Sequence, residues 1–200
     1  MIRTLGIDLD NTIIDYSGAF LEIARVEYPQ INFDNLDKSY FKTELTKLLG
    51  ETEWTKCQSR LYGEYIQWAK PHDGFLEALR TIYKLGWVVK IISHKSQYSI
   101  SNNSINLRKP AFTWITEHIS RFFPIEFNPD NDVLFADSIT HKIRLIEDTG
   151  CDAFIDDLQK ILLSLPAKVN KYWIFPDSHP SSPAIKCIRD WSSLDFYDFQ

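Results

Sequence analysis

Two carboxylates stand two residues apart at the end of an apolar segment near the start of the chain. The segment runs through Ile7 into Asp8-Leu9-Asp10-Asn11-Thr12. A carboxylate can attack phosphorus directly, and a second one two residues away can move the proton of the leaving group. The same letters are also typical of an Asx turn with helix-capping residues, so this segment alone leaves both interpretations open.

A second apolar segment ends in paired carboxylates, because Ala153-Phe154-Ile155 is followed by Asp156 and Asp157. Four carboxylates meeting at one place would repel one another unless a cation or bound protons compensated their charge. Oxygen ligands of this kind suit Mg²⁺. A third apolar segment leads into Ser93, whose hydroxyl can donate to a phosphoryl oxygen.

These residues need a fold that brings segment ends together, and the alternation of short apolar runs with helix-like stretches predicts one. We expect an α/β fold with a doubly wound, mainly parallel sheet of five strands. The carboxyl ends of such strands share one edge, where ligands bind in open α/β sheets. The expected strands are Arg3–Asp8, Trp87–Ile92, Asp132–Ala136, Asp152–Asp156 and Lys171–Phe175.

Residues 16–70 do not follow this alternation and are predicted to form two or three helices inserted after the first strand. Within them an apolar stripe recurs every three or four residues, at Trp54, Cys57, Leu61, Tyr65 and Trp68. Such a stripe normally packs a helix onto its neighbours, and the alternative is that some rings line a substrate pocket. The role of the segment after residue 190 stays open.

Together these motifs resemble the haloacid dehalogenase-like (HAD) hydrolase superfamily, with its Rossmann-like fold, in order and placement over nearly the whole chain. The run from Asp8 to Thr12 is similar to its first motif (DxDxT), Ser93 to its second, and Asp156-Asp157 to the DD form of its fourth. The resemblance implies a catalytic core of residues 1–15 and 71–200 and a small helical C1-type cap of residues 16–70.

The resemblance also implies residue roles. Asp8 would be the nucleophile and a Mg²⁺ ligand, and Asp10 the general acid and base with its carbonyl on the metal. Thr12 would support the loop and Ser93 would hold the phosphoryl group. Asp157 is favoured as the direct metal ligand with Asp156 beside it, and the reverse assignment stays open.

The third motif of the family is a lysine, and two positions compete for it. Lys142 lies in a helix-like stretch 14 residues before Asp156, which leaves room for one helix and a turn, and it is favoured. Lys109 begins an earlier helix and is the alternative, as a substrate-binding lysine. By the same resemblance His94 and Lys95 would contact substrate, or else they simply begin a helix.

Composition limits the function classes. The 22 Lys and Arg against 27 Asp and Glu give a net charge of −5, which disfavours binding of nucleic acid through its phosphates. No apolar run is long enough to span a membrane, no secretory signal is visible, and the three cysteines are far apart, so a cytoplasmic protein is expected. The oligomeric state is left open.

The leading interpretation is a Mg²⁺-dependent phosphatase that hydrolyses a small phosphomonoester through an aspartyl-phosphate. The retained Asp10 disfavours dehalogenation, and the cap disfavours large protein substrates. The pattern is similar to 5′(3′)-deoxyribonucleotidases and to HAD proteins of surface polysaccharide biosynthesis, so a nucleotide or a sugar phosphate would serve. The alternatives are phosphotransfer to a sugar hydroxyl and an inactive binding module. Rings that could stack on the substrate are Tyr16, Phe20, Trp54 and Tyr62.

Overall fold

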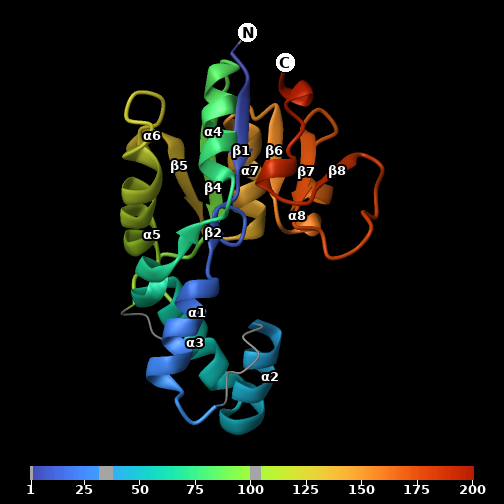
Figure 1. Ribbon diagram of the computed structural model, residues 1–200. Helices are drawn as coiled ribbons and strands as arrows, with labels where there is room; N and C mark the ends of the chain where they lie inside the picture. Colours follow the sequence, from blue (N-terminus) through green and yellow to red (C-terminus); the bar gives the residue numbers. More distant parts are fainter. Residues whose placement is uncertain (1, 32–37, 100–104) are drawn as a thin grey trace.

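A single parallel sheet forms the centre of the protein, whose computed structural model describes residues 2–31, 38–99 and 105–200 (Figure 1). The described sheet has six strands in the order β5-β4-β1-β6-β7-β8, and every neighbouring pair is parallel. This confirms the predicted α/β architecture. The strands are β1 Thr4–Ile7, β4 Val88–His94, β5 Val133–Ala136, β6 Ala153–Asp156, β7 Asn170–Ile174 and β8 Ile185–Ile188.

The prediction of five strands was wrong by one, because β8 was missed. β8 has only four residues, and its middle pair, Lys186 and Cys187, is exposed at the outer edge of the sheet. Only Ile185 and Ile188 are buried, so the segment lacks the apolar run of a strand covered on both faces. β4 is also longer than expected, because its pairing with β5 continues through Ser93 and His94.

Two apolar cores cover the two faces of the sheet, because side chains along a strand alternate between its faces. In β6, Ala153 and Ile155 belong to the core that includes residues of α4 and α5. Phe154 belongs to the other core, with residues of α7 and α8. The helices are α4 Phe75–Lys84, α5 Arg108–Ile115, α6 Pro129–Asp132, α7 Ile139–Asp148 and α8 Gln159–Ser164, and a π-helical turn, Thr116–Ser120, continues α5.

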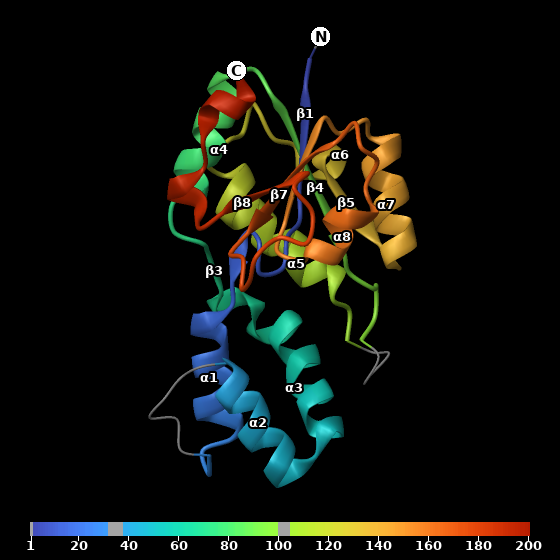
Figure 2. The same cartoon turned by 90° about the vertical axis from the view of Figure 1, so that its right-hand side faces the viewer.

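A helical unit projects beyond the carboxyl ends of the strands, as Figures 1 and 2 show. It contains α1 Ser17–Glu27, α2 Lys38–Leu49, α3 Glu51–Tyr62 and a 3-10 helix, Glu64–Trp68. Two short antiparallel strands, β2 Ile14–Asp15 and β3 Lys70–Pro71, connect it to the rest of the chain. Among its helices and those of the other described residues, none is both long and apolar enough to cross a lipid bilayer.

Four of the five residues of the apolar stripe pack inside the helical unit. Trp54, Cys57, Leu61 and Tyr65 are buried, and the Trp54 ring stacks on Phe20 at a centroid distance of 6.2 Å. Trp68 departs from the pattern and is exposed. α3 ends before Gly63, and the following 3-10 helix has fewer residues per turn, so the α-helical spacing no longer applies there.

The C-terminal segment is docked. Trp191, Leu194 and Phe199 are buried, and the Trp87 indole N–H donates to the Phe199 carbonyl at 2.7 Å. Arg3 donates to the same carbonyl at 2.8 Å, which ties the end of the chain to the start of the sheet.

Candidate active site

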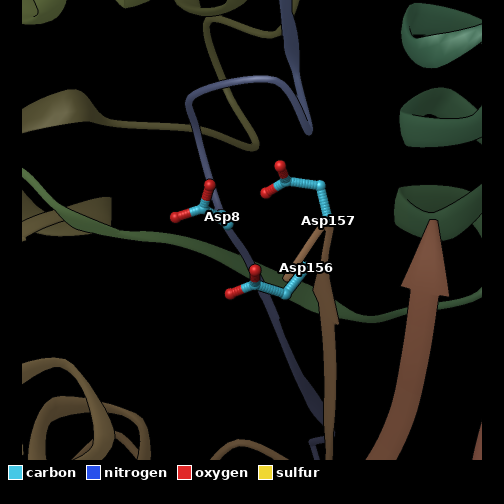
Figure 3. A group of neighbouring side chains, drawn as sticks. All are labelled: Asp8, Asp156 and Asp157. Atoms are coloured by element: carbon cyan, nitrogen blue, oxygen red, sulfur yellow. The ribbon is translucent and has the colours of Figure 1, made fainter. Parts of the chain in front are cut away.

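Three carboxylates from two neighbouring strands meet at the carboxyl edge of the sheet. Asp8 follows β1, Asp156 ends β6, and Asp157 is the next residue. One carboxylate oxygen of each lies within 4.8 Å of the others, and Figure 3 shows all three at the strand ends. β1 has β4 on one side and β6 on the other, so the cluster lies where the chain reverses its winding direction, the usual ligand position in such sheets.

A buried lysine links two of these carboxylates. Lys142 Nζ lies 2.5 Å from Asp8 Oδ1 and 2.6 Å from Asp156 Oδ2, and the lysine side chain is 2% exposed. α7 presents it there because Ser138 caps the helix by accepting from the His141 N–H, which fixes the first turn at the carboxyl edge of the sheet.

Burial is the largest influence on the pKa values of Asp8 and Asp157 in this cluster. It raises the pKa of Asp8 to about 8, with the Lys142 ammonium acting in the opposite direction and Asp156 and Asp157 adding to the rise. Burial alone would lower the pKa of Lys142, but the carboxylates of Asp8 and Asp156 outweigh it and raise that pKa. The pKa of Asp157 is raised to about 6, chiefly by burial and by Asp156. A bound cation would act against the rise at each carboxylate.

The donor set suits a divalent metal ion such as Mg²⁺. Three carboxylates face one ammonium, so the cluster carries excess negative charge when ionised, and all of its donors are hard oxygens. Both oxygens of Asp156 already accept hydrogen bonds, from Lys142 and from the Leu158 N–H. Asp157 Oδ1 accepts a longer bond, 3.2 Å, from Thr12.

Asp10 is held by a pair of groups apart from the cluster. The Tyr16 hydroxyl donates to Oδ1 at 2.5 Å, and Lys95 Nζ lies 2.8 Å from Oδ2. The Lys95 side chain is 3% exposed and its ammonium lies over the Tyr62 ring. Burial first, and then the Asp10 carboxylate, raise the pKa of Tyr16, so this hydroxyl stays protonated and remains a donor.

Thr12 connects the first acidic loop to the second. Its hydroxyl donates to Asp157 Oδ1 and accepts from the Asp157 N–H at 3.1 Å. The loop turns sharply at Asn11, which has a φ of 62°, a left-handed conformation that asparagine tolerates. The Trp191 indole N–H donates to the Thr12 carbonyl at 2.9 Å, so the C-terminal segment also supports this loop.

A cavity of about 150 Å³ opens onto these residues, and it brings together most of the predicted site. Ser93, which is 1% exposed, and His94 reach it from β4. Its lining also includes Asp8, Asp10, Lys142 and Asp157. Asp156 lies behind them, fully buried, in contact with Lys142.

Lys109 is not brought to this cavity. It is exposed at the start of α5 and lines a separate groove with Glu64 of the helical unit and Trp114. The described lining also includes a cation that the sequence analysis did not single out, namely Lys160 in the first turn of α8. Its position three residues after Asp157, at a helix start, was the available signal.

The fold is shared with many solved structures. Scans of the sequence against protein-family models and against curated proteins found no match. A HAD-like family hydrolase from Streptococcus pneumoniae superposes with a TM-score of 0.61 at 12% identity, covering 100% of this chain and 99% of that one. The HAD-hydrolase YfnB of Bacillus subtilis, solved with bound magnesium, superposes with a TM-score of 0.60 at 16% identity, covering 99% of this chain and 98% of that one.

A third structure carries an anion. It is a HAD family hydrolase from Deinococcus radiodurans with bound phosphate and sodium, with a TM-score of 0.54 at 10% identity, covering 94% of this chain and 91% of that one. At these identities the likeness shows the fold. The chain therefore has the Rossmann-like HAD fold over its described length.

Proposed function

We propose that this protein is a member of the HAD superfamily and a Mg²⁺-dependent phosphatase of small phosphomonoesters. The observation that carries the proposal is the Lys142 ammonium held between Asp8 and Asp156 at the edge of a small cavity. It orients one oxygen of Asp8 and leaves the carboxylate facing space of about 150 Å³, on the scale of a phosphoryl group. Solved structures of this fold with magnesium and with phosphate are consistent with such a site.

In the first half-reaction an oxygen of Asp8 attacks phosphorus, and the bond from phosphorus to the leaving oxygen breaks. Asp10 donates a proton to that oxygen, so an alcohol departs and an aspartyl-phosphate remains on Asp8. In the second half-reaction Asp10 takes a proton from water, which attacks the aspartyl-phosphate and releases phosphate. Asp8 is thereby regenerated.

The other residues of the cavity hold the phosphoryl group. The Ser93 hydroxyl donates to one of its oxygens, and the charges of Lys142 and Lys160 favour an anion there. Tyr16 and Lys95 fix the carboxylate of Asp10 beside the loop. The Mg²⁺ ion would be held by Asp8, Asp157 and the Asp10 carbonyl, with Asp156 behind them, and would supply charge neutralisation for the phosphoryl oxygens.

The test is release of inorganic phosphate from nucleoside monophosphates, sugar phosphates and an aryl phosphate, in Mg²⁺ and in EDTA. We expect Mg²⁺-dependent release by the wild type, and a loss of at least about a thousandfold in Asp8→Asn, which keeps the side-chain size but removes the nucleophile. Asp148→Asn, at the exposed far end of α7, is the matched control. Equal activity of Asp8→Asn and this control would refute the nucleophile.

A further inference from the structure

A second and larger cavity adjoins the phosphoryl cavity. It has a volume of about 430 Å³ and lies between the acidic loop, the start of α1, the segment after β3 and the loop after β7. Asn11, Asp157 and Leu158 line both cavities, so the two spaces meet at the end of β6. A phosphomonoester with its phosphoryl group against Asp8 would have its organic part directed toward this space.

One wall of the larger cavity is aromatic. The His72 and Phe175 rings are in contact at a centroid distance of 4.3 Å, and Tyr16 and Phe20 line another part of the same space. Phe175 has a φ of 52°, a strained conformation for a residue with a large side chain, and its N–H is bound to the Ile188 carbonyl at 2.9 Å. Trp54, by contrast, is absent from this described lining and packs inside the helical unit.

The charge of the larger cavity is opposite to that of the smaller one. Its described lining contains Asp15, Asp157 and Asp177 and no lysine or arginine. His72 adds no compensating cation, since burial lowers its pKa. The Asn11 carbonyl can only accept, so the 3.2 Å contact places the imidazole proton on Nε2 and leaves Nδ1 as an acceptor. With Asp157 assigned to the metal, Asp15 and Asp177 still give this space a negative charge.

We propose that the larger cavity binds the leaving group of the substrate and selects it by charge. The substrate class is a phosphomonoester with one phosphate whose organic part is uncharged or cationic, with an apolar face for the His72–Phe175 pair and hydrogen-bond donors for the carboxylates. Bisphosphates and phosphorylated carboxylic acids are excluded by repulsion from Asp15 and Asp177. This inference rests on the proposed function, because that function places the phosphoryl group in the adjoining smaller cavity, against Asp8.

The test is binding of three ligands of nearly equal size that differ in charge at one end. Glucosamine 6-phosphate, glucose 6-phosphate and 6-phosphogluconate are titrated calorimetrically, with Mg²⁺, into Asp8→Asn, in which turnover is blocked. We expect 6-phosphogluconate to bind about tenfold or more weakly than glucose 6-phosphate, and glucosamine 6-phosphate at least as tightly. Equal or tighter binding of 6-phosphogluconate, or no binding of any of the three, would overturn the inference.

A charge reversal at Asp177 tests whether the preference among these ligands comes from the larger cavity. In Asp8→Asn combined with Asp177→Lys, the preference for the amine over the carboxylate should fall about tenfold, because an exposed repulsion becomes an attraction. Asp148→Lys makes the same charge change at the far end of α7 and should leave the preference unchanged. An unchanged preference in Asp177→Lys, or an equal shift in Asp148→Lys, would overturn the assignment. Phosphate release by the wild type is scored separately, so failure of the proposed function and failure of this selectivity are distinguishable.

Discussion

Replacing Lys142 by Met removes a buried charge while keeping an unbranched side chain of similar length. The ammonium contacts Asp8 at 2.5 Å and Asp156 at 2.6 Å, with these side chains 8% and 0% exposed. Water therefore cannot reach the Asp156 carboxylate that the substitution leaves behind, and it reaches Asp8 only from the small cavity. Removal of one partner from a buried ion pair typically costs about 3–5 kcal/mol, a large share of the usual total stability of about 5–15 kcal/mol.

The loss should depend on pH, and its sign follows from linkage. Lys142 lowers the pKa of Asp8, which burial has raised to about 8, so its removal raises that pKa further. A carboxyl group whose pKa is raised by folding binds its proton more tightly in the folded than in the unfolded protein. The bound proton therefore favours folding, fully so below the unfolded pKa of about 4. This contribution is lost as the pH rises through the folded pKa. Asp8 is protonated in both folded proteins until the pH approaches 8, and only the variant keeps this proton above that pH, so the deficit of Lys142→Met relative to wild type should be larger at about pH 9 than at about pH 5.5.

The assay is urea unfolding in EDTA at both pH values, with Lys160→Met as the control. Lys160 lines the same cavity but is exposed, so its replacement should change the free energy of unfolding by less than about 0.5 kcal/mol. A deficit below about 1 kcal/mol for Lys142→Met, or one that does not grow with pH, would refute the buried ion-pair argument. Added Mg²⁺ should reduce the deficit, because carboxylates that lack the Lys142 ammonium attract the cation more strongly, and the folded variant then gains more from binding it than the wild type does.

Two further substitutions test packing and positioning. Gly6→Ala would place a Cβ 2.4 Å from a ring carbon of Phe154 in the centre of the sheet. The free energy of unfolding should therefore fall by about 1–3 kcal/mol. A urea midpoint equal to that of the wild type would contradict this packing. Tyr16→Phe keeps the ring but removes the donor to Asp10, so kcat should fall about tenfold with KM within about threefold. Tyr65→Phe, which loses a hydroxyl bond inside the helical unit, should leave kcat unchanged, and equal values for both variants would argue against a positioning role.

The sequence predicts the central sheet well because its inner strands are covered on both faces. β1, β4 and β6 are short apolar runs, as burial on two sides requires, and their carboxyl ends carry the acidic residues and Ser93. Strand order was not needed to expect the cluster, because parallel strands place all their carboxyl ends at one edge. The same reasoning fails at the outer edge, where β8 needs only two buried side chains.

The surroundings of Asp10 could not be predicted from local pattern. Tyr16 was expected to stack on substrate, and its ring does line the larger cavity, but its hydroxyl is committed to Asp10. Lys95 reaches the same carboxylate from the end of a different strand. Such contacts depend on how the helical unit and the loop after β4 meet the first acidic loop, and that geometry is set by tertiary packing.

The choice between the two lysines illustrates what the helical pattern can add. Both lysines lie in helices that begin at the carboxyl edge of the sheet, so their positions along the chain do not decide which of them reaches the acidic cluster. Lys142 is buried on the same face as Ile146, four residues later, so a lysine stands on the apolar stripe of α7. In α5 the buried residues are Ala111, Trp114 and Ile115, and Lys109 is exposed beside them. A charged residue on a buried stripe requires a buried partner, and carboxylates at the ends of β1 and β6 are the partners that the fold brings within reach.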